Sequence, residues 1–250
     1  MLEQTKATDR PRADESRTTL VVGATGGIGR ALVEQLAAQP EHTVIASGRR
    51  ALPTFADERI RCEQLDVTDE AAVADLFSRI GALDQVILAQ GLLHAGKQLP
   101  EKTIRRFDPQ FFLETVTVNT LPALLVAKYA AQAFKGVASP RFVALSARVG
   151  SITDNHLGGW YSYRASKAAL NMVIKTLAIE WQRILDRPIV AALHPGTVAT
   201  DLSEPFQRGV PPEKLFTAEY SADRLLEVLG NLTPADNGGF FAWDGAAIPW

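Results

Sequence analysis

A glycine-rich turn between a strand-like run and a helix-like run constrains this chain more than any other stretch. Residues 18–22 (TTLVV) are apolar and rich in β-branched side chains, which is typical of a buried strand. Four glycines follow between positions 23 and 29, and residues 31–37 (ALVEQLA) have helical periodicity. Glycines let the backbone approach a pyrophosphate, whose charge faces the free N–H groups of the helix start. This order predicts the phosphate-binding corner of a dinucleotide fold, although many glycine-rich turns bind nothing.

Strand-like and helix-like segments alternate along the rest of the chain. Further strands are predicted at 43–47, 60–65, 84–89, 141–146, 189–193 and 239–243. Helices are predicted to end near 39, to start at 70 behind a Thr68 or Asp69 cap, to run through 116–121 to about 134, and to cover 160–185 and 218–229. Pro122 predicts a kink near Asn119. The alternation predicts an α/β fold: a doubly wound, Rossmann-type sheet of seven parallel strands, with helices on both faces and ligands at the strands' carboxyl ends.

Bulk properties narrow the class of protein. The 250 residues suffice for one large domain, predicted over 18–250 behind a polar tail, 1–17, expected to be disordered. No uninterrupted apolar run reaches the ~20 residues of a membrane span, and a net charge of −2 favours neither nucleic acid nor an anionic membrane. Cys62 is the single cysteine and falls in a predicted strand, so we expect a small core residue rather than a nucleophile. One cysteine fits a reducing cytoplasm, and we expect a cytoplasmic protein.

The ends of the second and third strands predict how an adenosine group would be bound. After Ser47–Gly48 the chain has no acidic residue to accept from the free 2′-hydroxyl of NAD; Arg49 and Arg50 follow instead. Arginine at this position accommodates the 2′-phosphate of NADP, unless both arginines merely belong to a solvated loop. Asp66, with Val67 after it, ends the third strand; it is a candidate to meet the adenine ring, or it fixes the turn.

Tyr163 and Lys167 form the most informative polar pair. They are four positions apart in a predicted helix, so they share one face. A free tyrosine has a pKa of about 10, and an ammonium one turn away lowers that pKa by favouring the phenolate. Tyr163 would then exchange a proton with a substrate oxygen, and Lys167 would also bind a cofactor ribose. The spacing alone is common in amphipathic helices; behind a glycine turn and a fifth strand ending in serine it indicates catalysis.

These motifs make the chain similar to the short-chain dehydrogenase/reductase family over nearly everything from Thr18 onward. The resemblance implies catalysis by Tyr163 and Lys167, with Asn119 holding a proton-relay water. It implies a nicotinamide cofactor bound by these two residues and by Gly23, Thr25, Gly27, Ile28, Gly29, Gly91, Pro195, Gly196, Thr197, Val198 and Thr200. The stretches SARVGSI, GGWYSYRASK and AWDG…IPW are most similar to the C-factor-like and sniffer-like carbonyl reductase branch.

The chain departs from the family pattern at three places. Val22 stands where threonine usually precedes the first glycine, and Ala89–Gln90 replaces an asparagine pair after the fourth strand. Ala147 occupies the position of the catalytic serine, whose hydroxyl polarises the substrate carbonyl. Ser146 is our first choice to replace it and Ser151 the second; the alternative is that either is only a loop residue.

Several loop residues are candidates to contact a substrate. Leu92, Leu93, His94, His156, Leu157 and Trp160 would line a pocket or simply pack, and the segment 203–216 would close over the substrate or stay a static loop. His94, His156 and His194 lack metal-ligand spacing, so no metal is predicted.

The main hypothesis is an NADP-dependent oxidoreductase, with NAD possible, that reduces a small-molecule carbonyl or runs the reverse reaction. The family also implies a homodimer or homotetramer that associates through the long helices. Ala147 and the lost asparagine pair keep a second hypothesis open: a nucleotide-sensing or signalling protein with weak catalysis. A third, ranked last, is an epimerase or dehydratase acting on a nucleotide sugar, for which the C-terminal region leaves little room.

Overall fold

The computed structural model describes residues 16–40 and 42–250. The expected disordered tail falls almost wholly on residues 1–15, which lie outside the described residues. Arg17, included in that expectation, is instead the first residue of a strand.

A sheet of seven parallel strands forms the centre of the molecule, in the order β3-β2-β1-β4-β5-β6-β9. Each predicted strand is present, and its ends lie within one residue of the prediction. The strands are β1 (Arg17–Val22), β2 (His42–Gly48), β3 (Ile60–Gln64), β4 (Gln85–Leu88), β5 (Arg141–Leu145), β6 (Ile189–His194) and β9 (Gly239–Ala242). The strand order reverses between β1 and β4, so the crevice for a ligand opens beside those two strands. The predicted Rossmann-type fold is confirmed.

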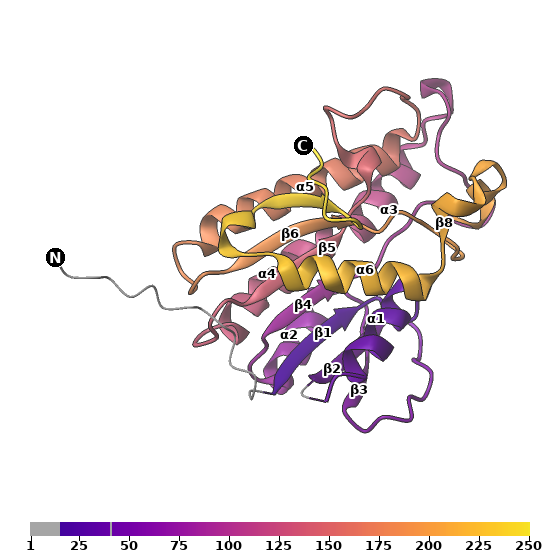
Figure 1. Cartoon of the computed structure of the whole chain (residues 1–250). Coiled ribbons are helices and arrows are strands. Elements are labelled where there is room, and N and C mark those ends of the chain that lie inside the picture. The colour runs from indigo at the N-terminus through magenta and orange to yellow at the C-terminus, as the bar shows by residue number, and fades with distance from the viewer. Residues whose placement is uncertain (1–15, 41) are drawn as a thin grey trace.

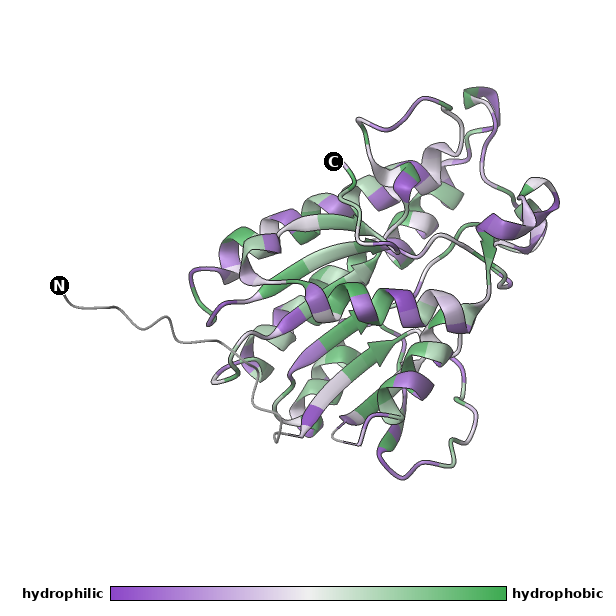
Figure 2. Ribbon diagram, in the orientation of Figure 1, coloured by the Kyte–Doolittle hydropathy of each residue, from purple (hydrophilic) through white to green (hydrophobic). Residues whose placement is uncertain are grey.

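Helices cover both faces of the sheet. They are α1 (Gly27–Ala37), α2 (Glu70–Ile80), α3 (Pro109–Asn119), α4 (Leu121–Ala133), α5 (Tyr161–Trp181) and α6 (Ala218–Asn231). Figure 1 shows α6 crossing in front of the strands. Successive strand residues face opposite sides: Leu20 and Val22 pack with α2, α4 and α5, whereas Val21 packs with α1 and α6. The inner strands are buried on both faces and are therefore hydrophobic along most of their length (Figure 2), whereas the edge strand β3 is largely polar and partly exposed.

Shorter elements at the carboxyl end of the sheet escaped the sequence analysis. A separate pair of two-residue strands, β7 (Thr197–Val198) and β8 (Leu215–Phe216), frames the segment between β6 and α6. The described residues also form short 3-10 turns: η1 (Ile104–Arg106), η2 (Arg148–Gly150), η3 (Glu204–Gly209), η4 (Pro212–Lys214) and η5 (Pro234–Asp236). The segments after β4, β5 and β7 project from one end of the sheet (Figure 1).

The helix that carries Asn119 is interrupted, as Pro122 predicts. Thr120 separates α3 from α4, and its N–H still bonds to the carbonyl of Val116. By length and composition alone, Pro109–Ala133 is apolar enough to cross a membrane. In its most apolar stretch of 18 residues, 44% is buried inside the protein. The segment is not an uninterrupted apolar run, because polar residues such as Glu114 and Asn119 interrupt it; it meets the criterion only on average hydropathy. Core helices of soluble proteins meet the same criterion, and here α3 and α4 both contact α5.

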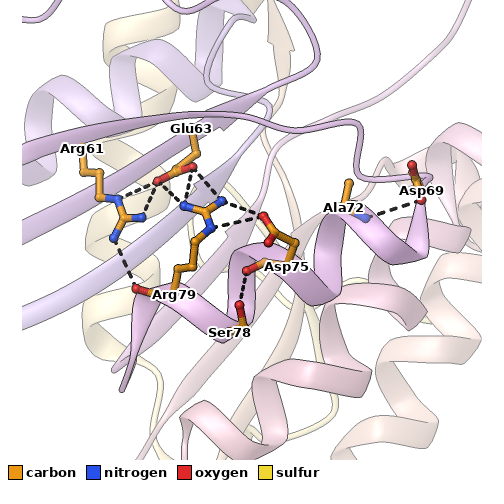
Figure 3. A network of polar contacts seen from close by, with 7 residues as sticks. All are labelled: Arg61, Glu63, Asp69, Ala72, Asp75, Ser78 and Arg79. Carbon is orange, nitrogen blue, oxygen red and sulfur yellow. Dashed lines mark hydrogen bonds and ion pairs between the residues drawn. The ribbon is translucent and has the colours of Figure 1, made fainter.

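Strand β3 lies at one edge of the sheet, and its polar side chains connect it to α2. Glu63 receives hydrogen bonds from Arg61 (2.6 Å) and Arg79 (3.2 Å), and Arg79 also binds Asp75 (3.1 Å) (Figure 3). Asp69 caps α2 by accepting from the N–H of Ala71 and Ala72, as expected. Cys62, expected in the core, is exposed, because an edge strand has one face open to solvent.

Candidate active site

The glycine corner is closed by backbone contacts that leave no space for side chains. Gly23 has φ 90°, a left-handed conformation that favours glycine, and its N–H and that of Ala24 both donate to the carbonyl of Ser47 (2.9 Å each). A Cβ on Gly29 would lie 2.2 Å from the carbonyl oxygen of Gly23. A Cβ on Gly27 would lie 2.7 Å from the Thr200 methyl group, which brings the segment after β6 against the corner.

The start of α1 has the hydrogen-bonding groups that a pyrophosphate needs. Within the described residues, the N–H groups of Gly27, Ile28 and Gly29 donate to no protein acceptor, and the cap residue Gly26 provides no side-chain acceptor. The first turn also carries no acidic residue. Nearby, the buried Oε1 of Gln90 has no hydrogen-bond partner in the described part of the chain, and the Gln90 backbone packs against Gly23. Three free donors at the positive end of a helix fit the phosphates of a dinucleotide.

A pocket of about 290 Å³ adjoins the glycine corner. Its lining consists of small residues and two arginines: Ala24, Thr25, Arg30, Arg50, Ala51 and Pro53. Arg30 also pairs with Glu34 (2.8 Å) on the exposed side of α1. Arg49, the arginine assigned from the sequence, is not among the lining residues; its carbonyl accepts from Gln64 (3.2 Å). Arg30 is not predicted from the sequence, because the position expected to bind the 2′-phosphate lies at the end of β2.

Asp66 fixes the turn after β3. Its carboxylate accepts from the hydroxyl of Thr68 (2.6 Å) and from the N–H of the same residue (3.0 Å). These hydrogen bonds lower the pKa of Asp66 below its usual value, with a smaller effect from Arg49. Val67 is buried beside it. A contact of Asp66 and Val67 with adenine stays a prediction.

Tyr163 and Lys167 lie together on the buried face of α5. Only 7% of Tyr163 and 3% of Lys167 is exposed. The Lys167 ammonium lies 5.9 Å from the centre of the Tyr163 ring and donates to the carbonyl of Leu145 at the end of β5 (2.8 Å). The Tyr163 hydroxyl has no hydrogen-bond partner in the part of the chain that the structure describes, so it is available to a ligand.

Burial moves the pKa values of this pair in a direction that the sequence analysis did not anticipate. Desolvation penalises the charged forms: it raises the pKa of Tyr163 above its usual value and lowers that of Lys167 to about 8. The expected lowering of the Tyr163 pKa by the ammonium is therefore not found. The neutral phenol is the stable form near pH 7, and a neutral phenol can donate a proton.

Asn119 connects the end of α3 to the loop after β4. Its Nδ2 donates to the carbonyl of Leu92 (2.9 Å) and to the Ser166 hydroxyl (2.9 Å), and its Oδ1 accepts from the Leu92 N–H (2.6 Å). Gly91 lies between this side chain and Lys167: a Cβ on Gly91 would be 3.7 Å from Asn119 Oδ1 and 3.8 Å from Lys167 Nζ. Asn119 thus supports the wall beside Lys167, and its part in a proton relay stays a prediction.

Neither candidate serine has a hydroxyl free of other hydrogen bonds. Ser146 donates to Asn171 Oδ1 on α5 (2.6 Å), because the alternation along β5 turns position 146 toward that helix. The Ser151 hydroxyl accepts from the N–H of Asp154 (3.0 Å) and makes no other hydrogen bond in the described chain. Both side chains are buried. The assignment of a carbonyl ligand to either serine stays a prediction.

The segment after β6 is held firmly at its start. The Pro195 carbonyl accepts from the Ser221 hydroxyl (2.9 Å). Gly196 has φ 80°, and a Cβ there would collide with the Phe216 ring (2.6 Å). Thr197 and Val198 then pair with Leu215 and Phe216 through the β7–β8 ladder.

Aromatic side chains from three segments meet beside Tyr163. The Trp160 ring lies 6.1 Å from that of Tyr163 and 4.9 Å from that of Phe206, and Phe206 lies 6.3 Å from His94. Of the other pocket candidates, Leu157 is 92% exposed and Leu93 is buried; His156 is exposed and Leu92 half-buried. Phe206 belongs to the segment expected to close over a substrate, and that closure stays a prediction.

Comparison with known proteins agrees with this arrangement. Residues 17–210 match the family model for short chain dehydrogenases. A 1-hydroxy-2-glutathionyl-2-methyl-3-butene dehydrogenase from Rhodococcus sp. (strain AD45) is 33% identical over 93% of this chain and 99% of its own. The C-signal protein of Myxococcus xanthus is 33% identical over 54% of this chain and 76% of its own.

Solved structures also resemble this one. An NADPH-bound carbonyl reductase from chicken fatty liver has a TM-score of 0.78 at 29% identity, covering 94% of this chain and 95% of its own. The putative carbonyl reductase Sniffer of Caenorhabditis elegans has a TM-score of 0.79 at 25% identity, covering 95% and 100%. With its parallel sheet, glycine corner and buried tyrosine–lysine pair, this chain belongs to the short-chain dehydrogenase family, as an NAD(P)-dependent oxidoreductase of the C-factor-like and sniffer-like branch.

Proposed function

We propose that this protein is an NADP(H)-dependent oxidoreductase that reduces a small-molecule carbonyl to an alcohol and catalyses the reverse reaction. The observation that carries the proposal is the Tyr163 hydroxyl, which has no hydrogen-bond partner among residues 16–40 and 42–250 and belongs to a side chain packed beside Lys167. Lys167 in turn borders Gly91, next to the glycine corner. When bound, a nicotinamide supplies or accepts the hydride.

Each residue of the pair has a separate task in this proposal. Tyr163, neutral at pH 7, donates its phenolic proton to the carbonyl oxygen during reduction. Lys167 binds a cofactor ribose and, when protonated, stabilises the developing phenolate. Ser151 orients the carbonyl oxygen, because its hydroxyl donates to no acceptor among the described residues, whereas Ser146 already donates to Asn171. Asn119 keeps the loop after β4 in place.

A preference for NADP over NAD is supported by charge. Arg30 and Arg50 line the pocket beside the glycine corner, where a 2′-phosphate would add negative charge. Arg49 follows directly on β2 and remains a candidate for the same group. The NADPH-bound chicken carbonyl reductase is a structural relative with this cofactor.

The test measures NADPH oxidation by the purified protein with a panel of aldehydes and ketones. We expect turnover with at least one carbonyl and a loss of about 10²–10⁴-fold in kcat/KM for Tyr163→Phe. NADPH binding, measured by fluorescence titration, should be unchanged in this variant. Unchanged turnover in Tyr163→Phe, or no turnover by a wild type that binds NADPH, would contradict the proposal.

A second function is favoured by one observation at the carbonyl site. Ala147 has no hydroxyl, and the neighbouring Ser146 is already bound to Asn171. A protein that binds the nucleotide as a signal, with weak catalysis, would tolerate this loss; one relative carries the name C-signal. Nucleotide-dependent binding of a partner without turnover would distinguish this function from the first.

Association through the long helices is proposed on the basis of exposed apolar side chains. Leu113 on α3, Leu124 on α4, and Met172 and Ile179 on α5 are between 47% and 67% exposed. Sedimentation equilibrium of the wild type and of Met172→Glu would reveal whether a homo-oligomer forms through this face.

A further inference from the structure

Three consecutive residues before the catalytic helix have a left-handed backbone. Gly158 has φ 64°, Gly159 has φ 66° and Trp160 has φ 52°. Glycine adopts this conformation readily, but a bulky residue rarely does. Strained conformations of this kind persist where the surrounding structure enforces them, and they concentrate at functional sites. Trp160 lies three residues before Tyr163, so this strained residue adjoins the proposed active site.

Hydrogen bonds from two sides hold the left-handed segment. The Trp160 N–H donates to the carbonyl of Glu101 (2.5 Å), in the loop after β4. The Arg164 guanidinium donates to the carbonyls of Gly159 (3.0 Å) and Gly158 (3.2 Å). It also donates to the carbonyl of Val149 (3.2 Å) in η2. The loop after β4 and the first turn of α5 therefore both fix the direction in which the Trp160 side chain points.

Glu101 makes the second part of this support with its side chain. Only 2% of the residue is exposed, and its carboxylate accepts from both the N–H (3.1 Å) and the hydroxyl of Ser162. Among the described residues it forms no ion pair. A buried carboxylate without a cation is costly unless hydrogen bonds and a helix start stabilise it. Glu101 thus binds the residues on either side of Tyr161 and sets Trp160 relative to Tyr163.

The Trp160 ring, so directed, forms one wall beside the phenol. It stands at 76° to the Tyr163 ring, and Phe206 continues the wall at 57° to Trp160. His94 packs edge-on to Phe206, and its Nε2–H donates to the carbonyl of Asp201 (3.1 Å), which ties the segment before η3 to the loop after β4. Trp160, Phe206 and His94 are each half-buried, so part of each ring surface is accessible.

We propose that Trp160 is the specificity-determining residue of this enzyme and that Glu101 is the positioning residue that sets it. Trp160, with Phe206 and His94, selects carbonyl compounds whose reacting group is attached to a flat aromatic ring. Aromatic rings gain from stacked and edge-to-face contacts that a saturated ring of similar size does not make. The inference rests on the proposed carbonyl chemistry at Tyr163.

The test compares benzaldehyde with cyclohexanecarbaldehyde, two six-membered rings bearing the same reacting group, as substrates with NADPH. We expect the wild type to favour benzaldehyde in kcat/KM. Trp160→Leu should reduce that preference by about fivefold or more, since an aromatic pair contributes roughly a tenfold effect at most beyond its buried area. Trp160→Phe, which keeps an aromatic ring, should retain most of the preference for benzaldehyde. Tyr161→Leu is the matched control, because Tyr161 is adjacent and 39% exposed, and its preference should stay within twofold of wild type.

Glu101→Gln tests the positioning role. We expect a smaller preference for benzaldehyde through a higher KM, with the dissociation constant of NADPH unchanged. A merely structural loss would lower the rates for both aldehydes equally and leave their ratio intact. If Glu101→Gln does not fold, Ser162→Ala, which removes one of the two hydrogen bonds to the carboxylate, replaces it.

The two proposals fail in different ways. Binding of NADPH without turnover of any aldehyde contradicts the proposed function. Turnover of both aldehydes, with an unchanged ratio in Trp160→Leu, overturns the inference and leaves the proposed function standing.

Discussion

The two sides of the crevice are built from different kinds of atoms. The phosphate corner on the cofactor side consists mainly of backbone: a left-handed glycine, three N–H groups at the start of α1 that donate to no acceptor among the described residues, and strand ends fixed by parallel pairing. The substrate side consists of side chains, chiefly Trp160, Phe206 and His94, from three irregular segments. Backbone geometry cannot change at one position without disturbing its neighbours, whereas a side chain on a loop can be replaced alone. We therefore expect the fold to determine which cofactor class binds and the loops to determine the substrate.

The first prediction breaks the cofactor side. Gly29→Ala places a Cβ 2.2 Å from the carbonyl oxygen of Gly23, so the corner must shift. We expect a loss of stability of about 2–3 kcal/mol, a fall in Tm of roughly 5–10 °C, and NADPH binding too weak to measure.

Its control is Gly230→Ala in α6, where nothing lies within 4 Å of the new Cβ. We expect this helix position to gain about 0.5–1 kcal/mol in stability, with binding unchanged. Equal effects at Gly29 and Gly230 in calorimetry and titration would contradict the backbone view of the corner.

The second prediction asks which side chains contribute on the cofactor side. Arg50→Gln should raise the dissociation constant of NADPH about tenfold or more, because a charge-assisted hydrogen bond to a phosphate is removed. The constant for NADH should not change. Arg49→Gln should have a smaller effect, since Arg49 does not line the pocket. A larger effect for Arg49→Gln than for Arg50→Gln would indicate that Arg49, the residue predicted from the sequence, binds the 2′-phosphate.

The third prediction concerns Lys167, at the junction of the two sides. Burial lowers its pKa from an ordinary value of 10.5 to about 8 in the folded protein, so between these pH values mainly the unfolded chain holds the proton. Stability rises with pH wherever the unfolded state binds more protons. The stability of the wild type relative to Lys167→Met should therefore be constant below pH 8 and increase above it, by about 2 kcal/mol at pH 9.5. Urea unfolding of both proteins at pH 7, 8.5 and 9.5 measures this; a flat difference would rule out a lowered pKa.

The smallest effect is expected at the rim of the substrate side. Leu157 is 92% exposed, so Leu157→Ala should change kcat/KM for any carbonyl substrate by less than twofold. A larger change would show that the loop after β5 folds onto the substrate, and the wall would then extend beyond Trp160.

The contrast between the two sides also explains what could be predicted from the sequence. The strands, the glycine corner and the Thr120 break follow from local patterns, because apolar alternation, glycine and proline act on the backbone where they stand. Ser146 could not be assigned in this way, because the pleat of β5 decides that its hydroxyl turns to Asn171. The prediction that Cys62 lies in the core is wrong, because no local sequence signal shows that β3 is an edge strand of the sheet.

Glu101 and Arg30 gave no usable signal. Glu101 lies in an irregular loop, and its importance depends on Ser162, 61 positions later in the chain. Arg30 belongs to the motif stretch, but only the packing of α1 beside the end of β2 turns it toward the same pocket as Arg50. Contacts between distant segments decide both roles.

The ion-pair network of Arg61, Glu63, Arg79 and Asp75 lies at the β3 edge of the sheet. A parallel sheet that ends at β3 leaves a row of backbone groups on which a foreign strand could grow. Charged side chains along an edge strand disfavour such pairing, because an added strand would have to desolvate them. The same residues that fasten α2 thus guard the protein against polymerising edge to edge.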